Sequence, residues 1–418
     1  MVMGLLRELN RYSLQFCFFL FLSVVSLVMD WPFLVSQSFI FLVLITIFQK
    51  SGKRIIWRKG IKEKLKRLSW KEPLLWIGIP FLVTLLSLFW SDSIAGNTRL
   101  VQVQIPLLAI PIVFCLADPI KQRDLELFGL MMVLFTTLVC IFVLINYWIN
   151  YDAIMVLLSR GKHIPTPSNH IRFSMTCGLV CILAIWLYGQ PISKKNKAIS
   201  LFLIAGSIFL FLFLHILAVR TGIVLLYAYL VILILWAIFQ EKSMRSTALV
   251  FLSVLILLPF LAIRLVPSLK AKFSYMRWEL QSVGMDKEMQ ASDSDRVKSI
   301  VYSLELWKSH PILGTGVGDL KDDLIQFYQQ KGWQSNRFLY PHNQYVRDLL
   351  CFGLIGLGIN FLSYLFLIFN NKNYKRPYFF GLLTFFLLSF LVETTLDTNF
   401  GVSLYAVGLS LLVKKPMG

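Results

Sequence analysis

The chain has 418 residues, of which 57% are hydrophobic and 15% are charged, and its formal net charge is +19. A typical soluble domain carries about 25% charged residues, and its apolar residues recur at helix or strand spacing. Here the apolar residues form unbroken blocks of roughly 17 to 25, long enough to cross a bilayer core of about 30 Å. The composition indicates an all-α integral membrane protein and excludes a soluble enzyme, a fibrous protein, a disordered chain and a small disulfide scaffold.

These blocks predict about twelve membrane spans. In chain order the spans cover residues 13–29, 33–49, 73–90, 98–117, 127–149, 172–189, 200–219, 221–240, 247–265, 344–369, 378–393 and 402–413. They divide the chain into three parts. Residues 1–265 carry the first nine predicted spans, 266–343 form one long loop, and 344–418 carry the last three.

Basic residues predict which ends of the spans face the cytoplasm. The largest group lies in the loop 50–72 and consists of Lys50, Lys53, Arg54, Arg58, Lys59, Lys62, Lys64, Lys66, Arg67 and Lys71. With the N-terminus in the cytoplasm, every short basic connection falls on that side, as the positive-inside rule requires. We therefore expect both termini to be cytoplasmic. The basic excess reflects this topology and attraction to anionic membrane lipid, and it does not indicate a nucleic-acid partner.

Two connections stand out on the opposite face. One covers residues 150–172 and includes SRGKHIPTPSNHIRF; the other is the long loop 266–343, which has the length to fold on its own. In the long loop, RVKSIVYSLELWKS and LKDDLIQFYQQKGW predict two amphipathic helices along the membrane surface. Asp293 or Ser294 is suited to cap the first of them.

A glycine run joins these two predicted helices and comprises Gly314, Gly316 and Gly318. It follows a helix instead of a strand and lacks the spacing of a dinucleotide fingerprint. The run therefore predicts a tight turn.

Three arginines on the far side are candidates for an anion site. A charge at membrane depth costs about 2.5 to 3.5 kcal/mol on insertion scales, so each one needs a reason. Arg220 lies between two spans that meet with almost no loop, and it either snorkels to lipid headgroups or binds an anion, because the guanidinium fork matches phosphate oxygens. Arg296 is either a solvated charge or a second contact for the anion. Arg172 is either an interfacial anchor or a third contact for the anion. Together they predict positive charge around one pocket that suits a diphosphate.

His342 stands in FLYPHNQYVRDLL, just before the tenth predicted span. Pro341 is suited to the first helical position, which predicts that His342 lies in the first turn, where the helix dipole disfavours imidazolium. A neutral imidazole can take a proton from a sugar hydroxyl. The alternative is an interfacial histidine bonded to backbone. Asn343 either caps the helix or orients the base and a sugar.

Two carboxylates precede the last predicted span, Glu393 and Asp397 in LVETTLDTNFGV. No histidine or further carboxylate is spaced beside them as a metal site would require. A structural or acceptor-binding role is favoured over a metal site.

The motifs around these residues resemble the O-antigen ligase and polymerase superfamily of the bacterial inner membrane. They are Arg220 in AVRTGIVLL, Arg296 in DRVKSIVYSLELWKSHPILGTGVGD and His342 in PHNQYVRDLL, and the resemblance covers residues 200–370 in motif and the whole chain in topology. It implies a multi-pass, GT-C-type glycosyltransferase that is inverting, independent of metal and cofactor, and active at the periplasmic face. The implied donor is a glycan on undecaprenyl diphosphate, and the acceptor in the ligase branch is a hydroxyl of the lipid A core.

The resemblance also implies roles for the residues that match its motifs. Arg220 and Arg296 would bind the diphosphate and His342 would activate the acceptor hydroxyl, while Arg172 joins them by position alone. A ligase is favoured over a polymerase, which extends lipid-linked repeats, and a periplasmic protein O-oligosaccharide transferase is a further branch. A lipid or polysaccharide transporter is the competing class, but transporters place ionisable residues near the bilayer midplane, often in two related halves.

Overall fold

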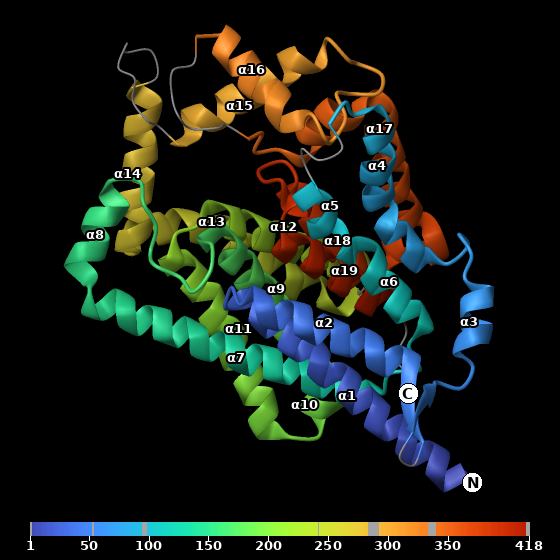
Figure 1. The fold of residues 1–418 in the computed structure, drawn as a ribbon. Coiled ribbons are helices and arrows are strands. Elements are labelled where there is room, and N and C mark those ends of the chain that lie inside the picture. The colour runs from blue at the N-terminus through green and yellow to red at the C-terminus, as the bar shows by residue number, and fades with distance from the viewer. Residues whose placement is uncertain are drawn as a thin grey trace. The chain divides into compact units, whose positions relative to one another are not determined.

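The computed structural model describes residues 2–51, 54–93, 98–240, 242–282, 292–332 and 340–414. Within these residues nearly all regular structure is helical, and the strands form one short hairpin (Figure 1). The predicted all-α class is confirmed. The chain divides into two compact units, which are described separately: the first combines residues 1–67, 116–282 and 415–418, and the second combines 68–115 and 283–414.

The first unit is a helical bundle with a hairpin after its second helix. Its elements are α1 (Val2–Val28), α2 (Pro32–Ile47), β1 (Phe48–Ser51), β2 (Arg54–Trp57), α3 (Ile61–Arg67), α7 (Gln122–Ile149), α8 (Tyr151–Ser159), α9 (His170–Tyr188), α10 (Pro191–Lys194), α11 (Lys197–Leu217), α12 (Arg220–Gln240), η3 (Lys242–Met244), α13 (Arg245–Leu265) and α14 (Pro267–Ser282). The strands pair antiparallel, with Phe48 opposite Trp57.

In the second unit, helices from residues 283–414 pack against the shorter helices from residues 68–115. Its elements are η1 (Pro73–Gly78), α4 (Ile79–Ser87), η2 (Leu88–Trp90), α5 (Thr98–Gln104), α6 (Pro106–Leu116), α15 (Ser292–Trp307), α16 (Leu320–Gln330), α17 (Gln344–Phe369), η4 (Asn370–Lys375), α18 (Pro377–Ser389), η5 (Thr395–Asp397) and α19 (Asn399–Val413).

The described residues contain nine helical segments that are long and apolar enough to cross a membrane. Each coincides with a predicted span. The other three predicted spans are the shorter apolar helices α2, α18 and α19. In the first of these the helix stops at Ile47 because the chain enters β1, and α18 stops at Ser389, before the predicted end at 393. A count of twelve spans therefore stays a prediction.

In the second unit, α17 is broken near its start by Gly353, whose φ is 62° and ψ −165°. A turn of the chain at residues 311–316 supplies the backbone hydrogen bonds that the helix loses there. The amide of Thr315 donates to the carbonyl of Leu350 at 2.9 Å, and the amide of Leu354 donates to that of Pro311 at 3.0 Å. A Cβ on Gly353 would lie 2.2 Å from the carbonyl oxygen of Ile312, so the break requires glycine.

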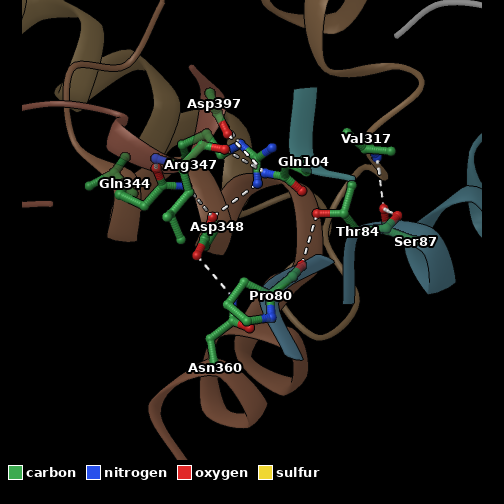
Figure 2. Close-up of polar contacts among 12 residues, drawn as sticks. Pro80, Thr84, Ser87, Gln104, Val317, Gln344, Arg347, Asp348, Asn360 and Asp397 are labelled. Atoms are coloured by element: carbon green, nitrogen blue, oxygen red, sulfur yellow. Dashed lines mark hydrogen bonds and ion pairs between the residues drawn. The ribbon is translucent and has the colours of Figure 1, made fainter. Parts of the chain in front are cut away.

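The same turn is anchored to the C-terminal end of α4, and its glycines approach other backbone closely. The amide of Val317 donates to Ser87 Oγ at 3.3 Å (Figure 2), and the Asp319 carboxylate accepts hydrogen bonds from the amides of Asp92 at 2.7 Å and Ser93 at 2.8 Å. Gly314 and Gly316 have positive φ values of 74° and 88°. The tight turn predicted from the glycine run is confirmed.

The two helices of the long loop form as predicted, but α16 does not lie along the membrane surface as expected. The apolar face of α16 is buried against protein, because Leu320, Leu324 and Tyr328 join a core cluster with Leu350 and Phe352 of α17. That face therefore does not lie on the membrane surface.

The first loop helix also starts earlier than expected. Helix α15 begins at Ser292, ahead of the residues predicted to cap it, Asp293 and Ser294, whose side chains lie outside the described residues. The preceding helix, α14, was not predicted.

Candidate active site

The predicted site residues fall in both units. Arg172 and Arg220 belong to the first, whereas Arg296, His342 and Asn343 belong to the second. The geometry of each group is described within its own unit.

In the first unit, Arg220 is the first residue of α12. Ala218 ends α11 in the left-handed conformation with a φ of 54°, so that the chain reverses over two residues. The Arg220 side chain is exposed, and its Nη1 donates to Met276 Sδ on α14 at 3.1 Å. Arg172 is half-buried in the first turn of α9, which Asn169 caps by accepting from the Ile171 amide at 3.0 Å.

A further cation of this unit lies beside two histidines. The rings of His163 and His170 stack with centroids 3.4 Å apart, and Lys272 Nζ lies 3.2 Å from His163 Nδ1. Lys272 also donates to the carbonyl of Gly161 at 2.6 Å. The sequence does not predict this group, because Lys272 comes from helix α14, which has no apolar block.

In the second unit, His342 immediately precedes the N-cap of α17, which begins at Gln344. The prediction that His342 lies in the first helical turn is wrong. The cap is Asn343, whose Oδ1 accepts from the Val346 amide at 3.1 Å, and asparagine is among the residues that best satisfy a free helix-terminal amide. His342 is half-buried.

Arg296 and the residue next to His342 meet at the same short segment between α18 and α19. Arg296 Nη2 lies 3.6 Å from Glu393 Oε1, with the two side chains 31% and 24% exposed. Asn343 Nδ2 donates to the carbonyl of Leu391 at 3.0 Å. Residues 391–393 therefore lie between a guanidinium on α15 and the start of α17.

The same segment ends at Asp397, which belongs to a buried ionic cluster centred on Arg347. The sequence motifs did not predict this cluster. The Arg347 side chain is fully buried, and its Nε lies 2.9 Å from Asp397 Oδ2 while its Nη1 lies 3.0 Å from Asp348 Oδ1 (Figure 2). Its guanidinium carbon also lies 4.9 Å from the ring centre of Phe352. An arginine buried in a membrane helix is costly unless paired, and here it bridges two carboxylates.

Neutral side chains complete this cluster. Gln104 Nε2 donates to the carbonyl of Leu396 at 3.0 Å, and Asn360 Nδ2 donates to Asp348 Oδ2 at 3.0 Å. The Tyr340 hydroxyl donates to Asp397 Oδ2 at 2.7 Å. Burial is the main cause that raises the pKa of Tyr340 well above its usual value, which keeps the phenol protonated and able to donate.

The arginines of the two units differ in whether their guanidinium groups are buried or reach the surface. The Arg347 guanidinium has no exposed surface and holds the structure together, whereas those of Arg220 and Arg296 reach the surface of their units and can meet an anion. One signal for the buried cluster was present in the sequence, namely that Arg347 and Asp348 stand inside an apolar block.

Comparison with known proteins gives one family match. No curated protein matches the chain. Residues 205–361 match the family model described as O-antigen ligase, a segment that contains Arg220, Arg296 and His342. This match supports the O-antigen ligase and polymerase superfamily, and the long apolar helices of the described residues fit a multi-pass membrane protein.

Proposed function

We propose that the protein is an O-antigen ligase, which transfers a glycan from undecaprenyl diphosphate to a hydroxyl of the lipid A core at the periplasmic face of the bacterial inner membrane. Both termini then lie in the cytoplasm. The observation that carries the proposal is the meeting of Arg296 and Asn343 at residues 391–393, next to His342. The guanidinium that we propose to bind the donor and the residue that follows the proposed base thus contact the same short segment.

The reaction we propose is a single displacement. The acceptor oxygen forms a bond to the anomeric carbon while the bond from that carbon to the phosphate oxygen breaks, which inverts the configuration. The acceptor proton passes to a ring nitrogen of His342, and general-base help of this kind gives about 10² to 10⁴ in rate. The glycosyl diphosphate carries the required energy, so the reaction needs no ATP, and in this proposal arginine side chains take the role that a metal ion would have at the leaving diphosphate.

The arginines have the complementary role of binding the departing diphosphate. Guanidinium groups held in place stabilise charge that develops in the transition state without reorganisation. In this proposal Arg296, Arg220 and Arg172 are the diphosphate-binding residues. The ion pair between Arg296 and Glu393 is partly exposed, and such pairs contribute about 0–1 kcal/mol, so a diphosphate can displace the carboxylate at small cost.

An O-antigen polymerase would use the same donor and the same chemistry, and it would differ only in its acceptor. The test therefore offers both acceptors to the purified full-length protein in vesicles that contain lipid-linked glycan. Growth of the lipid A core supports the ligase. Growth of lipid-linked repeats would overturn the ligase in favour of a polymerase, and no glycan transfer to either acceptor would overturn both.

A further inference from the structure

We infer that Arg347 is a positioning residue for the proposed reaction, because it clamps the segment that carries His342 onto the segment that carries Glu393. The inference rests on the proposed function for its catalytic consequence. Its structural part rests on contacts within the second unit alone.

The first half of the clamp is an ionic bridge. Arg347 Nε lies 2.9 Å from Asp397, at the end of the segment 390–397, and Arg347 Nη1 lies 3.0 Å from Asp348, in the first turns of α17. The guanidinium thus joins the helix that follows His342 to the segment that leads into α19. Without it, Asp348 and Asp397 would face each other as two buried carboxylates with no cation between them.

The second half consists of hydrogen bonds from both sides of His342. Two residues before it, the Tyr340 hydroxyl donates to Asp397 at 2.7 Å. Two residues after it, the backbone amide of Gln344 donates to the carbonyl of Phe390 at 2.7 Å, and Gln344 Oε1 accepts from the amide of Leu396 at 3.0 Å. The position of His342 is therefore set at both of its flanks by the segment 390–397.

The same segment also contacts Arg296 when no donor is bound. Glu393 lies within it and contacts Arg296 at 3.6 Å. A displacement of the segment therefore moves the His342 imidazole, whose two flanks it holds, away from its place beside the bound donor, and this spacing does not depend on the Glu393 pair. Misplacement of a base by about 1 Å costs on the order of 10²-fold in rate. Arg347 acts on the reaction through this spacing and does not touch the substrate, because its side chain is fully buried.

Lysine cannot replace arginine in this role. The guanidinium presents a planar fork, with Nε directed to one carboxylate and Nη1 to the other, whereas an ammonium group is a point charge on a flexible stem. An Arg347→Lys variant keeps the charge and loses the bridge geometry. It should therefore fall between the wild type and Arg347→Met.

The test measures hydrogen–deuterium exchange of the full-length protein without substrate, and glycan transfer in parallel. We expect Arg347→Met to raise exchange in peptides that cover 340–348 and 389–397, and to lower kcat by about 100-fold while the donor KM changes by less than about threefold. Tyr340→Phe removes one hydroxyl and gives a folded second variant, with raised exchange in the same two peptides and a smaller loss of kcat.

A matched control is Arg376→Met in the same unit. Arg376 is half-buried and donates to Asn373 Oδ1 at 3.1 Å and to the carbonyl of Leu412, away from the 390–397 segment. It should raise exchange around 370–376, leave the peptides 340–348 and 389–397 unchanged, and keep kcat within about twofold.

Two results would overturn the inference: unchanged exchange in the two peptides when Arg347 or Tyr340 is altered, or an equal rise in exchange over the whole unit, which would make Arg347 a general stabilising residue. Failure of the proposed function gives a different pattern. The wild type then transfers no glycan, while the exchange measurement still decides whether the clamp exists.

Discussion

Arg296 Nη2 lies 3.6 Å from Glu393 Oε1, so the guanidinium proposed to bind the donor diphosphate contacts a carboxylate in the absence of donor. The pair makes Glu393 a competitor of the donor rather than part of the chemistry. Both side chains are partly exposed, which keeps the competition weak.

Glu393→Gln should therefore lower the donor KM by a few-fold and leave kcat nearly unchanged, because Arg296 no longer has to leave a charged partner. The change in stability should stay within about 0–1 kcal/mol. Steady-state kinetics with lipid-linked glycan measures this. Glu305→Gln, which removes the exposed pair with Lys331 at 2.7 Å, is the control and should change neither constant. Loss of turnover in Glu393→Gln would show that the carboxylate takes part in the reaction.

Gly353→Ala should destabilise the protein strongly. The residue has a positive φ, its Cβ would lie 2.2 Å from the Ile312 carbonyl oxygen, and backbone strain of this kind alone costs about 1–3 kcal/mol. Gly358→Ala in the same helix is the control, because a Cβ there meets nothing within 4 Å, and it should keep or raise Tm. Equal Tm values for the two variants would contradict the broken-helix geometry.

Arg220→Ala should raise the donor KM by about 10- to 100-fold, the range expected when a hydrogen bond to a charged group is lost. Arg220→Lys should keep only part of the affinity for the donor, because lysine retains the positive charge but cannot form the bidentate contact. The exposed Arg264, at the end of α13, gives the control variant Arg264→Ala. If both arginine-to-alanine variants bind donor equally well, Arg220 is an interfacial anchor and not a phosphate ligand.

Chelation should leave glycan transfer unchanged, because the proposed displacement relies on guanidinium groups to stabilise the leaving diphosphate. The measurement is the initial rate with and without EDTA. Inhibition that added Mg²⁺ reverses would argue for a metal-dependent mechanism.

The sequence predicted the long membrane helices well because an unbroken apolar block is a strong local signal. It missed α8, which is short, and α14, which is polar, and it missed the β1–β2 hairpin, which begins in the last residues of a predicted span and continues into the basic loop. Helix α14 begins at Pro267, and proline is well suited to the first helical position.

At the candidate site, the motifs identified Arg220, Arg296 and His342, and single-residue rules identified Asn343 as a possible cap. The cluster around Arg347 escaped prediction because its contacts join residues far apart in the chain, such as Gln104 with Leu396. No local pattern encodes such pairs. The predicted position of His342 is wrong because the helix begins after Asn343 and not at Pro341. Asparagine is a strong N-cap, and its side chain fixes the start of α17.

Whether His342 is the catalytic base is decided by glycan transfer in vesicles that contain labelled lipid-linked glycan and lipid A core, with His342→Ala compared with the wild type. The exposed His310 supplies the control variant His310→Ala. We predict that label moves to the core with the wild type and with His310→Ala, and that His342→Ala stays folded and transfers none. Transfer by His342→Ala at the wild-type rate would contradict the account.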